Sequence, residues 1–371
     1  MSGPRIGINL LWLRPGHAGG AERYAIGLIR SLADEAGDVD ATVFCAGAVV
    51  RAHPDLGQRL PVLVAPTGGR SRPARIVLES TWLAREAARR DLDLVHHLND
   101  VVPWVHPTPS VLTVHDLRSM QGAAVLGRVQ AAYLRAAVPR SIRTSRVVMT
   151  PTEFVRRAVI DRFAIDPARV AVVSAPVPRM DPAAATALEP DGPYFLYPAI
   201  TNRHKNHRTL LEAFAKVAAE RPGVRLVLTG TAGNAEAEVA AVIARLDLAS
   251  RVIRAGRLAD PAFDRLLADA VALVYPSTYE GFGLPIAEAM AVGCPVIAAA
   301  ATALPEVVGD AGVLVDPDDR DGWAAAMLQM LDDATLRNRL AEAGRDRVRA
   351  FTPTETARRL AAAYRQALDR P

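Results

Sequence analysis

The sequence predicts an α/β protein made of two doubly wound, Rossmann-like domains. Its 371 residues suit two domains at ~100–200 residues each. Short apolar runs alternate with longer helical patterns in both halves, as parallel sheets covered by helices require. Between the halves, residues 176–193 carry five prolines, which rule out a continuing helix or central strand there.

The N-terminal half carries five strand-like runs. The first, residues 5–13, precedes a helical pattern at 21–33 that places Tyr24, Leu28 and Leu32 on one face. The further predicted strands are 41–47, 93–98, 110–116 and 146–151. Apolar residues on both faces of these runs indicate a buried parallel sheet.

The C-terminal half repeats this scheme. Its predicted strands are 194–199, 224–230, 251–256, 271–277 and 294–300, each followed by a helical pattern. We therefore predict an N-terminal acceptor-binding domain at 1–183, a linker at 184–193, a C-terminal domain at 194–352 and a final helix at 353–371. Thr352, Pro353 and Glu355 form the signature of a helix start, and the helix is a candidate to pack back on the N-terminal domain.

Composition excludes several classes of protein. Two cysteines are too few for a disulfide framework or a Cys-rich zinc site. The longest uncharged apolar stretch, 289–304, is shorter than the ~20 residues of a spanning helix. The short apolar run 6–13 favours a first strand over a signal peptide, so we expect a cytoplasmic protein. Aromatic residues make up only 5% of the chain, which argues against nucleic acid as a partner.

Positive charge concentrates in the first half. Residues 1–185 hold 23 arginines against 16 acidic residues. This excess suits a phosphate-bearing partner or an anionic membrane surface, with a solvated arginine-rich surface as the alternative. Arginines flank apolar residues in two helix-like segments, 74–90 and 122–145. Either could meet an anionic membrane and a lipid-linked acceptor at the inner face, or be an ordinary surface helix.

The most informative stretch is YPSTYEGFGLPIAEAM, residues 275–290. A buried strand ends there, a glycine-rich turn follows, and a helix is predicted to begin near Pro285. Free N–H groups at a helix start suit a phosphate, and Gly281 and Gly283 allow close approach to the backbone. Glu280 and Glu288 flank this position, and carboxylates accept hydrogen bonds from hydroxyl groups. A nucleotide sugar has both groups; an ordinary strand–turn–helix connection is the alternative.

Two further clusters point to phosphate. Residues 200–214 open a helix with a cationic loop, for which phosphate binding is the natural use and a solvated basic turn is the alternative; its basic residues are Arg203, His204, Lys205, His207 and Arg208. Gly19 and Gly20 follow the first strand and would let a phosphate or sugar approach the backbone. Neither G-x-G-x-x-G nor a P-loop pattern occurs, which argues against a dinucleotide-dependent oxidoreductase or a P-loop ATPase.

Histidines end two of the predicted strands. His115 at the end of 110–116 is placed to line a ligand site and to hydrogen-bond a hydroxyl or the reacting centre. For His96 and His97 the pattern favours a buried structural role. No spacing typical of a metal site occurs, so we expect no bound catalytic metal and no cofactor beyond a nucleotide-sugar co-substrate.

EGFGLPIAEAMA at 280–291 resembles the E-x7-E region of retaining glycosyltransferases of family 4, which have the two-domain GT-B fold. The match covers nearly the whole chain, in the order GGAERY (19–24), TVHD (113–116), TPTEF (150–154), HKNHRTLLEAF (204–214) and PVIAAAATALPEVVGDAGVLVDPDD (295–319). In detail the chain is most similar to the bacterial mannosyltransferase-like subgroup, typically users of GDP-mannose in polysaccharide assembly.

The resemblance implies roles for individual residues. Glu288 would hold the ribose hydroxyls, and Lys205 with Arg203 would neutralise the diphosphate. His115 would touch the donor sugar near its anomeric centre. The remaining implied donor-site residues are Glu280, Gly281, Phe282, Gly283 and Leu284 around the sugar and phosphate, Gly19 and Gly20 at the diphosphate, and Gly230, Gly256 and Leu258 in the donor-binding domain, the last two near the base.

One position departs from the family pattern. Many members carry an arginine directly after the first strand of the second domain, where this chain has Ala199. Whether Arg203 takes its place stays open. The resemblance implies transfer of a hexose, with mannose favoured, to a glycan, lipid-linked or natural-product acceptor. A nucleotide-sugar epimerase, a phosphorylase of the same fold and a non-catalytic sugar-nucleotide binder are the alternatives.

Overall fold

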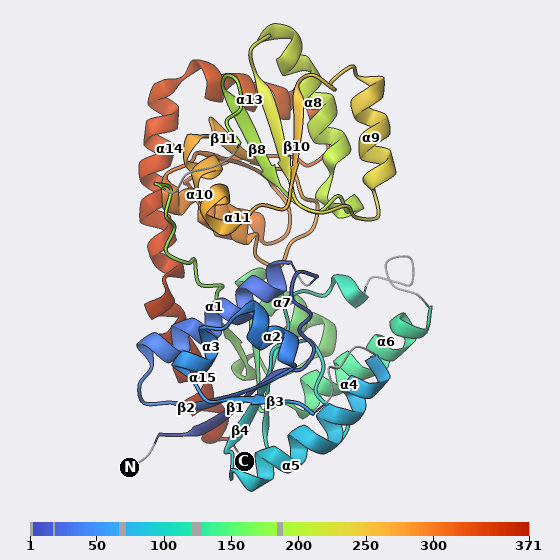
Figure 1. The fold of residues 1–371 in the computed structure, drawn as a ribbon, viewed down its shortest axis with the longest axis vertical. Helices are drawn as coiled ribbons and strands as arrows, with labels where there is room; N and C mark the ends of the chain where they lie inside the picture. Colours follow the sequence, from blue (N-terminus) through green and yellow to red (C-terminus); the bar gives the residue numbers. More distant parts are fainter. Residues whose placement is uncertain (1–2, 18, 67–71, 121–127, 184–187, 371) are drawn as a thin grey trace. The chain divides into compact units, whose positions relative to one another are not determined.

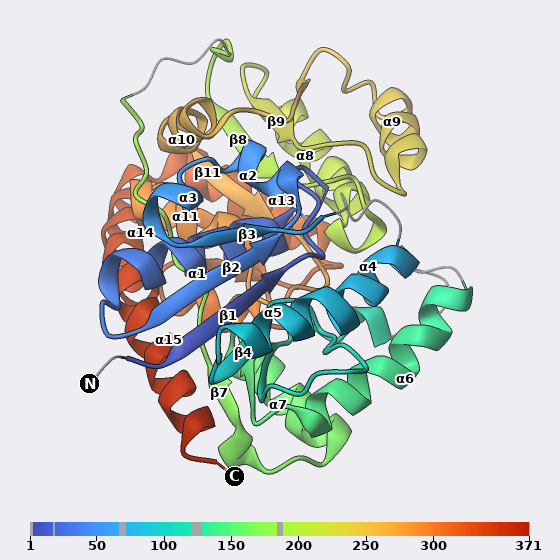
Figure 2. The ribbon, with the colours of Figure 1, turned by 60° about the horizontal axis from the view of Figure 1, so that its bottom comes forward.

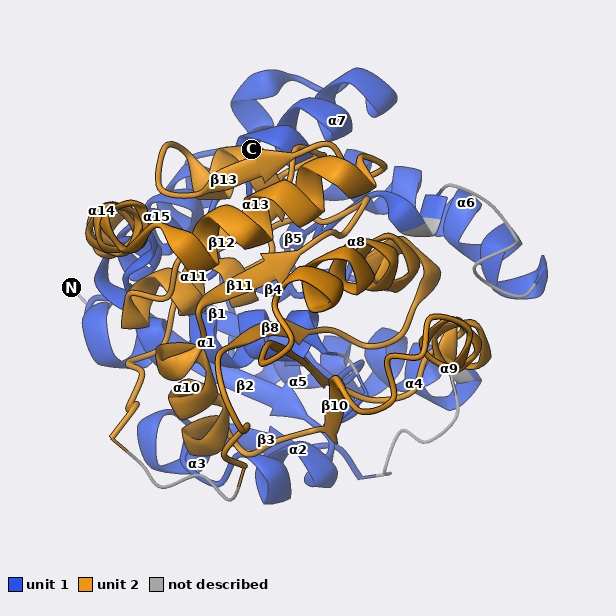
Figure 3. Ribbon diagram, turned by 90° about the horizontal axis from the view of Figure 1, so that it is seen from above, with its two compact units in different colours: residues 1–176, 351–371 blue, residues 177–350 orange. Residues whose placement is uncertain are grey.

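The computed structural model describes residues 3–17, 19–66, 72–120, 128–183 and 188–370 (Figure 1). The chain divides into two compact units, which Figure 3 colours separately. Unit 1 comprises residues 1–176 and 351–371, and unit 2 comprises residues 177–350. Part of the predicted linker, 184–187, and the start of the predicted helical segment 122–145 lie outside the described residues.

Unit 1 contains a seven-stranded parallel sheet in the order β3-β2-β1-β4-β5-β6-β7. Its strands are β1 (Arg5–Leu10), β2 (Asp40–Cys45), β3 (Val62–Val64), β4 (Leu94–His97), β5 (Ser110–Thr113), β6 (Val147–Thr150) and β7 (Val170–Val172). The central strands β4, β5 and β6 are buried throughout, because helices cover both faces of the sheet (Figure 2). The predicted α/β class is therefore confirmed for this unit.

Helices flank this sheet on both sides. They are α1 (Gly20–Glu35), α2 (Gly47–Ala52), α3 (Leu56–Arg59), α4 (Arg72–Leu78), α5 (Ala84–Arg89), α6 (Arg128–Thr144) and α7 (Glu153–Phe163), with short 3-10 turns at Arg118–Met120 and Pro167–Arg169. A π-helical turn, η1 (Glu79–Leu83), joins α4 to α5. The predicted helical segment 74–90 is thus helical as far as Arg89, with a change of helix type in its middle.

The last helix, α15 (Pro353–Leu368), belongs to unit 1. Its start is as predicted: the Thr352 hydroxyl accepts from the Glu355 N–H at 3.3 Å. The Glu355 carboxylate does not complete a capping box, because it pairs with Arg358 and Arg359 instead. The helix packs against α1, β4 and β6, so its apolar face completes the cover of the unit 1 sheet.

Unit 2 contains a six-stranded parallel sheet in the order β10-β9-β8-β11-β12-β13. Its strands are β8 (Tyr194–Pro198), β9 (Arg225–Thr229), β10 (Val252–Gly256), β11 (Ala272–Tyr275), β12 (Val296–Ala299) and β13 (Val313–Val315). Its helices are α8 (His207–Glu220), α9 (Glu236–Arg245), α10 (Asp260–Asp269), α11 (Leu284–Val292), α12 (Leu304–Val308), α13 (Arg320–Asp332) and α14 (Ala334–Arg347), with 3-10 turns at Arg203–Lys205 and Val348–Phe351. The second predicted doubly wound domain is also confirmed.

Each sheet has one point at which its strand order reverses. In unit 1 it lies between β1 and β4, where Asn9 is the register partner of His97. In unit 2 it lies between β8 and β11, where Phe195 pairs with Ala272. The connections from the two neighbouring strands run to opposite faces of the sheet at such a point, which leaves a crevice at the carboxyl edge where open α/β sheets bind ligands.

None of the helices in the described parts of the chain is long and apolar enough to span a bilayer.

Candidate active site

The loops that follow β8 and β11 meet at the strand-order reversal of unit 2. The Thr278 N–H donates to the His204 carbonyl at 2.8 Å, and the Thr278 hydroxyl contacts the same oxygen at 3.2 Å. The cationic loop 200–206 and the turn 276–283 therefore form one structure. The two motifs singled out in the sequence lie side by side at the carboxyl edge of this sheet.

An ion pair occupies the centre of this arrangement. The Lys205 ammonium donates to Oε1 of Glu280, and it lies 3.2 Å from the hydroxyl of Tyr275. The side chains of Lys205 and Glu280 are only 16% and 14% exposed. Burial by itself would raise the pKa of Glu280, but the charge and hydrogen bond of Lys205, together with Ser277 and His204, lower it. The carboxylate is therefore ionised beside a fixed positive charge.

Two tyrosines and a serine position this pair, and sequence reasoning missed all three. The Tyr197 hydroxyl donates to the Lys205 carbonyl at 2.5 Å and lies 3.3 Å from the Ser277 hydroxyl. The rings of Tyr197 and Tyr275 meet edge to face, with centroids 5.6 Å apart. Both tyrosines sit in apolar strands and resemble ordinary core residues, so only their place at the ends of β8 and β11 could have pointed to the site.

The glycine-rich turn sets the start of α11. Gly283 precedes the helix with φ of 90°, a conformation that favours glycine, and a Cβ there would lie 2.8 Å from Leu304. The N–H of Glu280 donates to the Thr302 hydroxyl at 3.0 Å, which ties the turn to the next loop. Gly281, Phe282 and Leu284 complete the turn, as the spacing predicted. The helix start thus lies directly beside the ion pair.

The other predicted residues of unit 2 differ in their surroundings. Glu288 lies about one turn inside α11 with a fully buried side chain, and its charge acts on Tyr275. Arg203 is exposed, and its N–H donates to Asn234 Oδ1 at 3.0 Å. The structure brings Lys205 next to Glu280 but gives Arg203 a place on the surface of the loop. The role of Glu288 toward ribose stays a prediction.

Gly230 directly follows β9, and Gly256 ends the neighbouring strand β10. Both have positive φ, and the Gly230 N–H donates to the Gly256 carbonyl at 2.7 Å. Leu258 follows in the loop before α10 and is partly exposed. The three residues therefore lie at the same carboxyl edge as the ion pair, farther along the sheet. Their predicted contact with the donor nucleotide stays a prediction.

In unit 1, His115 follows β5 and is held by its backbone and its ring. Its N–H donates to Asp100 Oδ1 at 3.1 Å, and its Nε2 lies 3.1 Å from the Leu98 carbonyl. Because a carbonyl only accepts, Nε2 carries the proton and Nδ1 carries a lone pair. Burial lowers the pKa of His115, so the ring is neutral. The rings of Tyr24 and His115 meet edge to face, with their centroids 4.9 Å apart.

Asp100 is an acidic residue that sequence reasoning did not single out. Its φ is 22°, and burial followed by the charge of Asp116 raises its pKa to about 7. Such a carboxyl group changes charge in the physiological range while its oxygen holds the backbone of His115. Asp100 is thus a positioning residue for the predicted catalytic histidine.

Gly19 and Gly20 form the start of α1 beside β1. Gly19 has φ of 54°, whereas the φ of Gly20 is not positive, and a Cβ on Gly20 would meet nothing within 4 Å. No local steric reason therefore requires glycine at position 20. Open space above the first residue of a helix is consistent with the predicted approach of a diphosphate.

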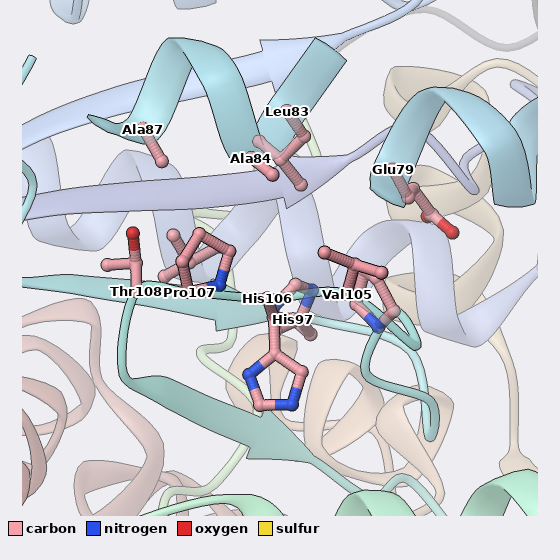
Figure 4. Close-up of a pocket in the computed structure, with 11 residues that line it drawn as sticks. Glu79, Leu83, Ala84, Ala87, His97, Val105, His106, Pro107 and Thr108 are labelled. Atoms are coloured by element: carbon pink, nitrogen blue, oxygen red, sulfur yellow. The ribbon is translucent and has the colours of Figure 1, made fainter. Parts of the chain in front are cut away.

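The predicted structural role of His96 and His97 is confirmed, since both are buried within β4. A small cavity in unit 1 lies between η1, α5 and the loop 103–108 (Figure 4), and of the two histidines of β4 only His97 lines it. His115, Gly19 and Gly20 do not line this cavity. Among the described residues, no three His, Cys, Asp or Glu side chains are grouped closely enough to hold a metal ion.

Two family models match the chain, one in each half. Residues 18–179 match Glycosyltransferase Family 4, and residues 183–347 match Glycosyl transferases group 1. A D-inositol 3-phosphate glycosyltransferase of Xylanimonas cellulosilytica is 30% identical over an alignment of 422 residues, with 99% of this chain and 98% of the relative covered. The chain belongs to glycosyltransferase family 4. The family predicted from the motifs is thereby confirmed.

Other relatives of the chain carry mannosyltransferase names. O-antigen chain mannosyltransferase B of Escherichia coli is 31% identical over 254 residues, and the match spans 66% of each chain. An O-antigen chain mannosyltransferase of Salmonella typhimurium is 27% identical over 331 residues, covering 86% of this chain and 89% of the relative.

Solved structures share the fold of this family 4 member along almost its whole length. Sucrose-phosphate synthase of Thermosynechococcus elongatus has a TM-score of 0.78 at 22% identity and covers 98% of both chains. The Anabaena protein HepE in complex with UDP and glucose has a TM-score of 0.75 at 20% identity, and the match covers 98% of this chain and 99% of HepE. The predicted GT-B fold, with two Rossmann-like domains, is confirmed.

Proposed function

We propose that this family 4 glycosyltransferase transfers a hexose from a nucleotide diphosphate sugar to a hydroxyl group, with retention of anomeric configuration. The observation that carries the proposal is the Lys205–Glu280 pair beside the start of α11. An ammonium and free helix N–H groups suit a diphosphate, and an ionised carboxylate suits sugar hydroxyls. The three lie together at the strand-order reversal of one sheet.

Mannose from GDP-mannose is the donor that we propose first. Two relatives that cover much of the chain carry the name O-antigen chain mannosyltransferase. Other relatives are named D-inositol 3-phosphate glycosyltransferases, and the structure of HepE contains UDP and glucose, so the base and sugar are the first points to test. We propose a glycan, lipid-linked or natural-product alcohol as acceptor.

The chemistry of transfer assigns a task to each group. Cleavage of the bond between the anomeric carbon and the phosphate oxygen builds positive charge on the sugar and negative charge on the diphosphate. Lys205 and the N-terminus of α11 stabilise the departing diphosphate, and Arg203 adds longer-range positive charge. These cationic groups do the work for which other transferases recruit a metal, so we propose transfer without a tightly bound metal.

Retention follows if the acceptor attacks from the face that the leaving group vacates. In this scheme the acceptor oxygen bonds to the anomeric carbon, and its proton passes to the departing phosphate oxygen. No enzymic nucleophile is needed. Glu280 holds hydroxyls of the donor sugar, Glu288 holds the ribose, and the neutral ring of His115 accepts from a sugar hydroxyl near the anomeric centre through Nδ1.

Glycoside hydrolases offer a contrasting use of two carboxylates. There one carboxyl group serves as acid and the other as nucleophile or base. In this chain Glu280 is paired with an ammonium and lies beside a helix start, which suits binding of an anion and its sugar rather than proton donation. A covalent glycosyl-enzyme trapped in the reaction would overturn the same-face scheme.

Calorimetric titration with GDP, UDP and dTDP tests the donor site. We expect one nucleotide to bind tightly and to bind at least tenfold more weakly to Lys205→Ala and to Glu288→Ala. NMR of the product formed from the matching sugar nucleotide then reports the anomeric configuration. An inverted product would contradict the retaining scheme.

The alternatives predict other outcomes in the same experiments. An epimerase would convert the donor without an acceptor, and a phosphorylase would require inorganic phosphate. A non-catalytic binder would hold the nucleotide but transfer no sugar to any acceptor. Activity that is unchanged by a chelator would support transfer without a tightly bound metal.

A further inference from the structure

Exposed apolar side chains gather on one part of unit 1. Six large hydrophobic residues are exposed among the described residues, and four of them lie on α4, α6 and the loop between β4 and β5. These four are Val129 at 85%, Val77 at 59%, Val105 at 58% and Trp104 at 49%. Single exposed apolar residues need no explanation, but a cluster of four on neighbouring elements does.

Direct contacts and electrostatic interactions link the elements that carry these residues. The Arg140 guanidinium on α6 lies 4.6 Å from the centre of the Trp104 ring and donates to the Trp104 carbonyl at 2.9 Å. Burial and the charge of Glu79 raise the pKa of Tyr133 on α6, and Arg75 on α4 opposes them. The four residues therefore belong to one region of the surface.

The same region is strongly basic. Helix α6 carries four arginines and no acidic residue. Arg128, Arg135 and Arg143 are exposed, and with Val129 they follow one helical stripe. Within the described residues none of these three arginines has an acidic partner. We call Val77, Trp104, Val105, Arg128, Val129, Arg135 and Arg143 the basic apolar face.

We propose that the basic apolar face docks on the surface of an anionic lipid bilayer. Arginines pair with anionic headgroups, while Val129, Val105 and the Trp104 ring enter the boundary between headgroups and acyl chains. Tryptophan favours that boundary because its ring is apolar and its N–H is polar. A nucleic acid would use the same arginines but would leave the valines exposed to water, so the apolar part of the face selects the bilayer.

The cavity of unit 1 lies beside this face. Val105 is one of its lining residues, together with apolar side chains such as Leu83, Ala87 and Pro103 (Figure 4). The loop 103–108 therefore presents apolar groups both to solvent and to the hollow beneath it. This arrangement suits a surface that meets acyl chains, and it does not depend on which sugar or nucleotide the site of unit 2 uses.

Co-sedimentation of the full chain with vesicles tests the proposal. We expect binding to phosphatidylcholine mixed with phosphatidylglycerol at low salt, weaker binding at high salt, and little binding to phosphatidylcholine alone. Arginines near an anionic surface contribute about fivefold each to binding. Arg128→Gln combined with Arg135→Gln should therefore lower the partition coefficient about 30-fold.

The control variant removes the same charge elsewhere. Arg358 and Arg365 on α15 are also exposed helical arginines of unit 1, and α15 lies on the opposite side of this unit from α4 and α6 in Figures 1, 2 and 3. Arg358→Gln combined with Arg365→Gln should leave binding within about twofold of wild type, because charges away from the membrane are screened. A control that weakens binding as much as the test variant would overturn the proposal, and so would absence of binding at low salt.

Fluorescence distinguishes insertion of the face from adhesion by net charge. The chain has four tryptophans, and Trp104 is the half-exposed one on this face. Anionic vesicles should shift the emission of wild type to the blue, and Trp104→Phe should lose most of that shift while still folding, as circular dichroism reports. An equal shift in both proteins would show that the Trp104 ring does not enter the bilayer and would contradict the proposal.

Discussion

Lys205 and Glu280 form an ion pair across 75 residues of sequence. The pair exists because β8 and β11 are neighbours in the sheet, so the loops that leave them meet at one edge. Both side chains are largely withdrawn from water, so neither charge is well solvated without the other. Stability and donor binding therefore depend on the same two residues.

Replacement of Lys205 should destabilise unit 2. Lys205→Met leaves the Glu280 carboxylate without its ammonium partner, which we expect to cost about 3 kcal/mol of unfolding free energy. Urea unfolding followed by far-ultraviolet circular dichroism measures this loss. The same variant should lose at least 100-fold in transfer rate, because the diphosphate loses its nearest cation.

The double variant separates charge from packing. Lys205→Met combined with Glu280→Gln removes both charges, so it should recover much of the stability lost by Lys205→Met alone and stay inactive. If the double variant is as unstable as the sum of the two single variants, the pair is not coupled and the structural relationship is wrong.

Gly20 should be required for activity but not for folding. Its φ is not positive and a Cβ meets nothing within 4 Å, so Gly20→Ala should keep or raise stability by up to about 1 kcal/mol. A diphosphate above the start of α1 would collide with the new methyl group. We expect the transfer rate to fall at least tenfold while the melting temperature does not fall.

Gly283 offers the contrasting case. Alanine there would need φ of 90° and would crowd Leu304, so Gly283→Ala should cost about 1–3 kcal/mol and lose activity together with stability. Melting curves and transfer rates of the two variants, measured side by side, check both expectations. Full activity of Gly20→Ala would show that no ligand occupies the space above α1.

Asp100 should make the stability of unit 1 depend on pH. Its pKa is raised to about 7, so the folded state holds a proton that the unfolded chain releases near pH 4. The stabilisation that the folded state gains by binding this proton more tightly is fully present below about pH 4 and is lost as the pH rises through 7. Relative to wild type, Asp100→Asn should gain stability between pH 4 and pH 8, up to about 4 kcal/mol.

Urea unfolding of wild type and of Asp100→Asn at each pH gives the difference between their unfolding free energies. Groups that titrate alike in both proteins cancel in this difference. Asparagine tolerates the backbone conformation of Asp100, and its carbonyl can still accept from the N–H of His115. Asp116→Asn is the matched control: without the repelling charge, the pKa of Asp100 should fall and the pH slope should shrink. Parallel stability curves for wild type and Asp100→Asn would refute the assignment.

The hydroxyl of Tyr364 should stabilise the attachment of α15 to unit 1. It lies 2.8 Å from Nδ1 of buried His96, whose Nε2 lies 2.8 Å from the Thr113 hydroxyl. Tyr364→Phe leaves one buried ring nitrogen without its partner, which we expect to cost about 1–3 kcal/mol. Thermal unfolding measures this loss of unfolding free energy. As a control, Tyr133→Phe, at a half-buried tyrosine of the same unit, should change the unfolding free energy by less than about 0.5 kcal/mol.

Prediction from sequence succeeded where a local signal coincided with the tertiary outcome. The helix 353–368 is as predicted because Thr352 and Pro353 mark its start, and the long apolar strands recur within two or three residues of their predicted ends. Three short strands were missed: β3, β7 and β13 have three residues each and lie at sheet edges. Edge strands are partly exposed, so their apolar pattern is weak.

In the candidate site, too, only the residues with a local sequence signal could be predicted. The residues that surround the start of α11 could be predicted, because glycines and a proline mark the turn and two carboxylates stand at a fixed spacing from it. Tyr197, Tyr275 and Asp100 could not be predicted from the sequence, since two tyrosines in apolar strands and one aspartate in a loop have no distinctive local pattern. Their importance comes from the partners that the fold gives them.

The sequence by itself determined the family, the α/β class and the chemical character of each loop, because composition, periodicity and turn residues are local properties. Only the tertiary structure decided that Lys205 rather than Arg203 lies against Glu280, that Asp100 holds His115, and that α15 completes unit 1. Those relationships join residues 15 or more positions apart. They depend on strand order and burial, which no local pattern encodes, because free energy of packing is a property of the whole fold.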